Sequence, residues 1–230
     1  MSDENNDQVV KMHPDLDAYL REGPFGLALD HPLVQELSID LEYAAVVNST
    51  YKHKSAELDK ALRRRDWYSY VFLHERSHRF DAFMRIADDI SSSRAYWELV
   101  RSVWIDSENV VQHDEEWFWL WNGKRRCKSY AMTAEDRKAF KQLPNELTIY
   151  RGIREAGNRY GLSWTLDRDK AVWFARRDGI DAGPVLLTAC AKKCDVHALL
   201  LGRKESEIII DEFVIIATEY GSETMSDVQG

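Results

Sequence analysis

Apolar residues recur at intervals of three and four along residues 32–144, for example in "LVQELSIDLEYAAVV", "AELDKALRRRDWYSYVFLHERSHRFDAFMRIADDI" and "AYWELVRSVW". This period is typical of amphipathic helices, and Gly123 is the single glycine in the stretch. A helix-capping signal supports the helical prediction, because Thr133 stands three residues before Asp136 and Pro144 ends the run that follows. We therefore predict a mostly helical region here.

The pattern changes in residues 145–230. Short runs rich in β-branched and aromatic residues follow one another, each bounded by glycine, proline or charge: "ELTIYRG", "YGLSWTLD", "GPVLLTACA", "VHALLLG", "ESEIIID" and "FVIIATEY". Such runs predict strands. A single short helix, "RDKAVWFARR", is expected among them.

These two sequence patterns predict an α+β protein, in which a helical region is followed by a compact, mainly antiparallel β-core. Several strands with one helix near the start do not fit a doubly wound sheet. Residues 1–31 are polar or interrupted by Pro14, Gly23, Pro24 and Gly26, so we expect a loosely ordered lead-in there. The expected organisation is thus a lead-in, a helical region over 32–144 and a β-rich region over 145–230.

Composition excludes several classes of protein. With 44% hydrophobic and 30% charged residues the chain is an ordinary globular one, and no apolar stretch reaches the roughly 20 residues of a membrane span. The acidic start "MSDENNDQ" does not read as a secretory signal, and three cysteines suit free thiols in a reducing compartment, so a cytoplasmic protein is expected. A net charge of -8 argues against coating nucleic acid through bulk electrostatics.

The run "HERSH" spells a zinc-protease signature, in which His74 and His78 would share one face of a helix and Glu75 would activate water. Glu98, twenty residues after His78, is a candidate third ligand. Two arginines beside the histidines oppose the approach of a cation, and the preceding segment reads as helix where such an enzyme needs a sheet edge. A zinc hydrolase is therefore the alternative interpretation, and a charged helix packed by its apolar side is the simpler one.

Three short signals fall in order within the β-rich region. They are "IYRG" with Arg151, "GLSWT" with Ser163 and Thr165, and "ESEIII" with Glu205 and Glu207. Each begins or lies on a predicted strand, so one sheet could present all three to a common cleft. Taken singly each has an ordinary explanation, such as an edge salt bridge for the arginine or a polar, protected sheet edge for the glutamates.

In combination these signals resemble the catalytic core of ADP-ribosyltransferases of the Arg–Ser–Glu group. The resemblance covers roughly residues 145–220 and includes the "AVWFA" helix directly after the serine strand. The chain departs from the family's usual Ser-Thr-Ser triplet, since it has Ser163-Trp164-Thr165 with a bulky middle residue. The resemblance implies that the β-core is of the ADP-ribosyltransferase type, and it implies transfer of ADP-ribose from NAD⁺, with NAD⁺ as a substrate and without a metal.

The resemblance also implies roles for single residues. Arg151, followed by Gly152, would bind the pyrophosphate of NAD⁺, which a guanidinium pairs in two places at once. Glu207 would hold a ribose hydroxyl and stabilise the oxocarbenium-like charge that develops when the nicotinamide bond breaks. Glu205 would orient or deprotonate the acceptor.

The remaining candidates surround these charged groups. By the same resemblance Ser163 would orient Glu207 or the ribose, and Thr165 would support the strand. Trp164 and Phe174 are aromatic candidates for lining the nicotinamide pocket, although packing of a helix on the sheet is the preferred interpretation of Phe174.

The resemblance implies a macromolecular acceptor, and a toxin or phage–bacterium conflict factor as the biological setting. The acceptor is a protein arginine or a nucleic acid, and the basic pair Arg203 and Lys204 next to Glu205 would suit an anionic one. An antitoxin or other inhibitory protein would be a further partner, and no membrane is involved. A catalytically silent interaction module with the same sheet is the second alternative.

Overall fold

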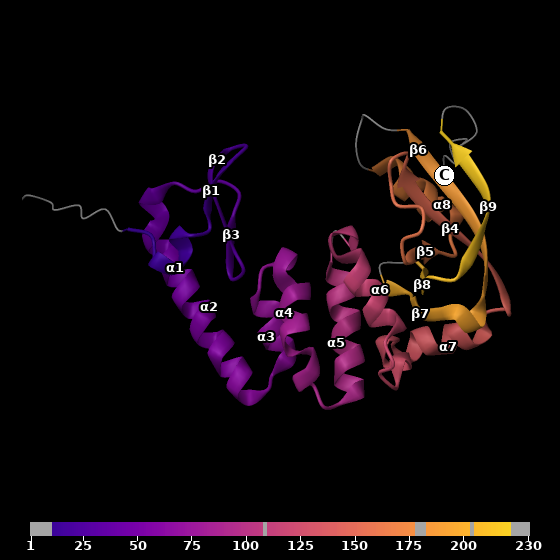
Figure 1. Ribbon diagram of the computed structural model, residues 1–230, viewed down its shortest axis with the longest axis horizontal. Coiled ribbons are helices and arrows are strands. Elements are labelled where there is room, and N and C mark those ends of the chain that lie inside the picture. Colours follow the sequence, from indigo (N-terminus) through magenta and orange to yellow (C-terminus); the bar gives the residue numbers. More distant parts are fainter. Residues whose placement is uncertain (1–10, 108–109, 178–182, 203–204, 222–230) are drawn as a thin grey trace, which may run out of the picture. The chain divides into compact units, whose positions relative to one another are not determined.

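The computed structural model describes residues 11–107, 110–177, 183–202 and 205–221 (Figure 1). The chain divides into two compact units. The first unit comprises residues 1–91 and 106–108, and the second comprises 92–105 and 109–230. The division expected at residue 145 therefore lies within the second unit, because the helices that follow residue 92 pack with the β-rich region.

The first unit begins with α1 (Pro14–Asp17) and a three-stranded antiparallel sheet made of β1 (Leu20–Gly23), β2 (Gly26–His31) and β3 (Val34–Glu36). The expected loose lead-in is therefore wrong for residues 20–31, and the helix expected from residue 32 does not start there. The physical reason is a tight turn: Gly26 has a φ of 107°, which favours glycine and joins β1 to β2.

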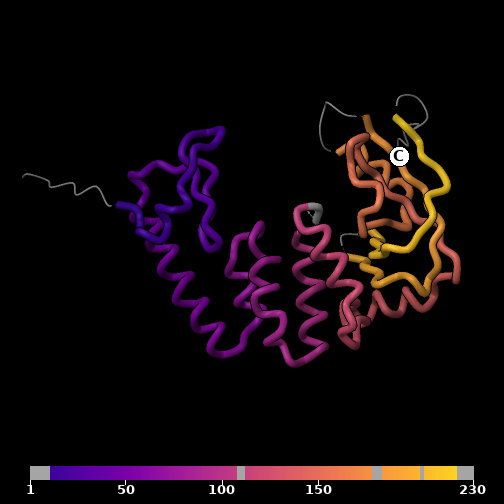
Figure 2. Tube along the Cα trace, in the orientation of Figure 1, coloured from indigo at the N-terminus to yellow at the C-terminus, as the bar shows by residue number. Residues whose placement is uncertain are grey.

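The helices of the first unit are shorter than the sequence pattern predicts. They are α2 (Ala44–Arg64), α3 (Trp67–Leu73) and α4 (Arg79–Ile86), traced in Figure 2. Arg65 ends α2 in the left-handed conformation, and Asp66 caps α3 by accepting a hydrogen bond from the Ser69 N–H at 3.1 Å. Apolar periodicity continues across these breaks, which is why the sequence reads as one helix.

The second unit opens with α5 (Ser93–Asp106), α6 (Asp114–Asn122) and α7 (Ala134–Gln142). The predicted capping box at the start of α7 is confirmed: the Thr133 hydroxyl accepts from the Asp136 N–H at 3.1 Å, and the Asp136 carboxylate accepts from the Thr133 N–H at 2.8 Å. Four tryptophans pack between α5 and α6 with almost no exposed surface, namely Trp97, Trp104, Trp117 and Trp121.

Six strands form the sheet of the second unit (Figure 1). Their order is β7-β8-β5-β4-β6-β9, and all neighbours are antiparallel. The strands are β4 (Glu146–Arg154), β5 (Ser163–Thr165), β6 (Pro184–Lys192), β7 (Val196–Leu200), β8 (Glu207–Ile210) and β9 (Phe213–Tyr220). The predicted α+β class, with a helical region ahead of an antiparallel sheet, is confirmed.

Helix α8 (Arg168–Arg177) packs on β4 at very close range. A side chain at Gly152 would have its Cβ only 1.8 Å from the carbonyl oxygen of Ala171 and 2.6 Å from the backbone nitrogen of Ala175. Glycine at this position therefore lets the helix backbone touch the strand, which fixes the distance between α8 and the residues that follow on β4.

Two further expectations can be compared with the described residues. Cys127, Cys190 and Cys194 are free thiols, as predicted. Within the described part of the chain, no helix is both long and apolar enough to span a lipid bilayer.

Candidate functional site

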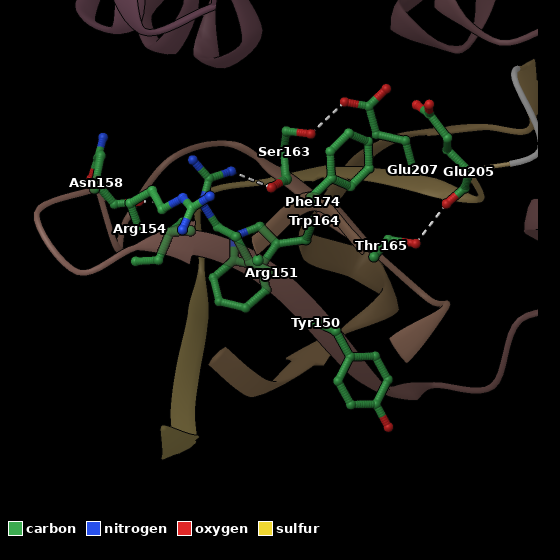
Figure 3. A pocket seen from close by; sticks show the side chains of 13 residues that line it. Tyr150, Arg151, Arg154, Asn158, Ser163, Trp164, Thr165, Phe174, Glu205 and Glu207 are labelled. Atoms are coloured by element: carbon green, nitrogen blue, oxygen red, sulfur yellow. Dashed lines mark hydrogen bonds between the residues drawn. The ribbon is translucent and has the colours of Figure 1, made fainter. Parts of the chain in front are cut away.

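A cavity of about 360 Å³ lies at the junction of β4, β5, β8 and α8 (Figure 3). It collects residues from separate segments of the sequence. The eight site residues expected from sequence all line it: Arg151, Gly152, Ser163, Trp164, Thr165, Phe174, Glu205 and Glu207. Tyr150, Ile153, Arg154, Gly157 and Asn158 complete its lining.

Arg151 projects from β4 toward the loop that precedes β5. Its Nε donates to the Asn158 carbonyl at 3.3 Å and its Nη1 donates to the Ser163 carbonyl. The guanidinium lies so close to Gly161 that a Cβ there would be 2.4 Å from Nη2. Nη2 has no hydrogen-bond partner among the described residues, so it retains N–H groups for an anionic ligand.

The charge of Arg151 is set by opposing influences. Burial lowers the pKa of its guanidinium, while the carboxylates of Asp114 and Glu207 raise it. The ordinary pKa of arginine is so high that the group stays cationic. The cavity therefore contains a desolvated, fixed positive charge near the carboxylates of Asp114 and Glu207.

Glu207 is held by two donors that meet on one oxygen. The Ser163 hydroxyl donates to Oε1 at 2.5 Å, and the Trp104 indole Nε1 donates to the same atom at 3.0 Å. Charge-assisted hydrogen bonds of this kind are about twice as strong as neutral ones. The carboxylate is thereby fixed in orientation.

The register of two strands explains why Ser163 and Glu207 meet. In the β5–β8 pair, Thr165 lies opposite Glu207 and Ser163 lies opposite Ile209. Ser163 is thus the diagonal neighbour of Glu207 on the same face of the sheet, within reach of a carboxylate side chain. Alternation sends the side chain of Trp164 to the other face.

Glu205 precedes β8 at a sharp backbone turn. Ser206 has a φ of 45°, an uncommon value for a residue with a side chain. The turn is held from both sides, because Thr165 Oγ1 donates to the Glu205 carbonyl at 2.5 Å and the Leu166 N–H donates to the Ser206 carbonyl at 3.1 Å. The turn places Glu205 just before β8, which begins at Glu207.

The two aromatic candidates differ in environment. The Trp164 indole is buried, donates to the Gly161 carbonyl at 2.9 Å and packs against Phe213, so it braces the loop beneath Arg151. Phe174 is half-buried and its ring borders the cavity (Figure 3). Phe174 is thus not fully buried as a core residue would be, and its ring is available to a ligand.

Sequence reasoning missed three polar contributors, namely Trp104, Asp114 and Asn158. Trp104 on α5 contacts Glu207 from 103 residues away, and Asp114 at the start of α6 accepts a hydrogen bond from the Asn158 amide at 2.7 Å. The available signal was weak, because one tryptophan among eight carries no local pattern that indicates a site. The helices of the second unit thus supply part of the candidate site.

The zinc interpretation fails on geometry. Helix α3 ends at Leu73, so His74 and His78 do not share a helix face: His74 is extended with its Nδ1 2.8 Å from the Tyr70 carbonyl, and His78 Nε2 lies 3.4 Å from Asp30 Oδ1. The proposed third ligand, Glu98, pairs with Arg94. Among the described residues, no three His, Cys, Asp or Glu side chains lie close enough together to hold a metal ion.

Arg203 and Lys204, named above as a basic approach to Glu205, lie outside the described residues. Comparisons of this chain with protein-family models, with curated proteins and with solved structures found no match.

Proposed function

We propose that the protein is a mono-ADP-ribosyltransferase that uses NAD⁺ as its substrate and modifies a macromolecular acceptor. The observation that carries the proposal is the pair Ser163–Glu207, joined by a 2.5 Å hydrogen bond in a cavity that Arg151 also lines. This is the arrangement of charges that the reaction asks for, with a cation for the diphosphate and an oriented carboxylate for the sugar. The β-core would then be of the ADP-ribosyltransferase type.

Two features of the described residues support the binding of a dinucleotide. Arg151 Nη2 retains donors for a phosphate oxygen, and the lack of a side chain at Gly161 lets the guanidinium pack against the loop in this position. The ring of Phe174 offers an apolar face to the nicotinamide. No metal is required for the chemistry that these groups would perform.

In the reaction the bond between the nicotinamide nitrogen and the ribose C1 breaks, and its electron pair leaves with the neutral nicotinamide. Positive charge then develops on the ribose carbon, as in glycoside hydrolysis, and the Glu207 carboxylate stabilises it. A nucleophilic atom of the acceptor forms the new bond to C1. The acceptor's proton passes to a base, for which Glu205 is placed on the same cavity.

The experiment that tests the proposal is incubation of the purified chain with NAD⁺ labelled in the adenylate half, together with a whole-cell lysate. Transfer of label to protein, RNA or DNA is expected, with release of free nicotinamide. Glu207→Gln removes the charge with little change in volume and should lower transfer by about 100-fold or more. Glu212→Gln, at an exposed position just beyond β8, is the matched control and should leave transfer unchanged.

The outcome also decides between catalysis and a silent interaction module. A folded chain that releases no nicotinamide and transfers no label would be such a module, and transfer by a folded Glu207→Gln variant would remove Glu207 from its role. Glu205→Ala should lower the rate of transfer to the acceptor more than it lowers the slower hydrolysis of NAD⁺ by water. The reason is that water depends less on a base on the acceptor side of the cavity.

A further inference from the structure

Asp114 joins helix α6 to the loop between β4 and β5, residues 155–162. Its Oδ2 accepts a hydrogen bond from the Asn158 amide at 2.7 Å, although 44 residues separate the two in the sequence. The backbone carbonyl of Asn158 accepts in turn from Arg151 Nε at 3.3 Å. Arg151 and Asn158 both line the cavity (Figure 3). Asn158 therefore connects the carboxylate of Asp114 to the guanidinium in the cavity.

The loop lies outside the strands, so the contacts that its own residues make determine its position. On the β5 side, the Trp164 indole donates to the Gly161 carbonyl at 2.9 Å. On the helical side, Asp114 holds the loop at Asn158, the residue whose carbonyl contacts Arg151. Loss of the contact with Asp114 would therefore release the part of the loop that orients the guanidinium.

Asp114 also influences the charge of Arg151. Burial lowers the pKa of the guanidinium, and the carboxylate of Asp114 raises that pKa more than the carboxylate of Glu207 does. Compensation of this kind matters because a buried cation without a nearby anion is strongly destabilising. The carboxylate acts across the loop, since its hydrogen bond goes to Asn158. A carboxylate bonded directly to the guanidinium would occupy the donors that a phosphate needs.

We propose that Asp114 is a positioning residue for the diphosphate of NAD⁺, which acts through Asn158 to hold the loop and Arg151 in the geometry that binds phosphate. This role rests on the proposed function and assigns part of its substrate binding to α6. Asp114 does not belong to the described lining of the cavity, so it acts on the ligand through Arg151. Its loss should weaken binding of the diphosphate and leave the Ser163–Glu207 pair in place.

Kinetic constants separate this role from catalysis. Asp114→Ala and Asn158→Ala each remove the hydrogen bond, and each should raise the KM for NAD⁺ about 10-fold while the kcat of nicotinamide release changes by less than about 3-fold. Because both changes remove the same interaction, the double variant should also raise KM about 10-fold, well short of the roughly 100-fold rise of independent effects.

Competing ligands show which part of NAD⁺ is affected. ADP-ribose, which carries the diphosphate, should inhibit Asp114→Ala about 10-fold less strongly than it inhibits the unaltered chain. Nicotinamide carries no phosphate and should inhibit both equally. A general loss of structure would weaken inhibition by both ligands, so the comparison distinguishes positioning from folding. Thermal melting of each variant provides a second check of folding.

Two further variants serve as controls. Asp114→Asn keeps an oxygen that can accept from Asn158, so its KM should stay within about 3-fold of the unaltered value. This variant also tests the proposal if Asp114→Ala fails to fold. Glu115→Gln removes a charge from the same first turn of α6 at an exposed position, and it should leave KM unchanged.

Four results would overturn the proposal. They are equal KM values for Asp114→Ala and Glu115→Gln, equal weakening of ADP-ribose and nicotinamide, multiplied effects in the double variant, and an Asp114→Asn variant as weak as Asp114→Ala. The proposed function is tested separately, because a folded, unaltered chain that releases no nicotinamide contradicts it alone. Calorimetric binding of ADP-ribose to the same variants then still tests Asp114, and no binding to the unaltered chain would overturn both proposals.

Discussion

The indole Nε1 of Trp104 donates to Oε1 of Glu207 at 3.0 Å, so a helix well before the β-rich region holds the central carboxylate of the cavity. The same oxygen accepts from Ser163. Trp104 is itself locked by edge-to-face contacts with Trp117 and Trp121. The helices α5 and α6 are therefore part of the site's support.

Trp104→Phe should lower the rate of NAD⁺ cleavage. The ring still fills its place in the cluster, but Glu207 loses one donor, and a hydrogen bond to a charged group contributes about 1.5 to 3 kcal/mol. We expect kcat to fall about 10- to 100-fold with little change in KM, measured by nicotinamide release.

Trp97→Phe serves as the control for Trp104→Phe. Trp97 belongs to the same cluster, but its Nε1 donates to the Arg126 carbonyl at 2.9 Å. Both variants should lose similar stability, and Trp97→Phe should keep its kcat. Equal losses of kcat in the two variants would mean that the cluster acts only through folding.

Gly152→Ala should disrupt the packing of α8. The added methyl group would lie 1.8 Å from the Ala171 carbonyl oxygen, and because its nearest atoms all belong to the α8 backbone, no side chain can move aside to make room. We expect a loss of about 3 kcal/mol or more in the free energy of unfolding, measured by urea denaturation. Gly183→Ala, whose new methyl would have its nearest neighbour at 3.9 Å, should cost far less.

Thr165→Val should affect transfer more than hydrolysis. The Thr165 hydroxyl donates to the Glu205 carbonyl and accepts from the Asp167 N–H at 3.0 Å, so it joins the turn at Ser206 to the start of α8. Without it the left-handed turn loses a restraint and Glu205 loses its fixed position. The ratio of acceptor labelling to nicotinamide release should fall about 10-fold, in line with the loss of the neutral hydrogen bond to the Glu205 carbonyl.

Thr165→Ser keeps the hydroxyl and should restore that ratio. A serine variant that behaves like the valine variant would show that the methyl group, through packing, matters more than the hydrogen bonds. An equal fall in labelling and in hydrolysis would mean that Thr165 stabilises the fold and does not act specifically on Glu205.

Parts of this arrangement could be predicted because they depend on neighbouring residues. Short runs rich in β-branched and aromatic residues indicate β4 and β8, and the order of Arg151, Ser163 and Glu207 along strands of one sheet predicts that they can meet. Their contacts depend on register and on a left-handed residue at Ser206, which no local pattern specifies.

Other parts could not be predicted from neighbouring residues. Strands β1, β2 and β3 contain three to six residues each, too few for a period to stand out beside the glycines and prolines of their turns. The "HERSH" segment has the letters of a helix motif, but α3 ends before it because the backbone of Glu75 bonds to the Pro32 carbonyl at 2.8 Å. In both segments, contacts with residues distant in the sequence determine the local structure.

The first unit should lose stability on mild acidification, and His74 should contribute to that loss. Burial lowers the pKa of His74 from 6.5; the cations Arg85 and Lys54 and the nearby His78 lower it further, whereas the Tyr70 carbonyl raises it. The folded state therefore holds a neutral ring where the unfolded chain binds a proton. Its stabilising contribution is full above about pH 6.5 and is lost as the pH falls from there toward the folded-state pKa.

Urea unfolding between pH 7.5 and 5.5 measures this effect against the variant His74→Leu, which cannot titrate. Between the two pKa values of His74 the unaltered chain should lose up to about 1.4 kcal/mol per pH unit more than the variant. His31 is also buried with a lowered pKa, so the variant retains a residual slope from it. Identical slopes would mean that His74 is equally protonated in both states, which its burial against the Tyr70 carbonyl opposes.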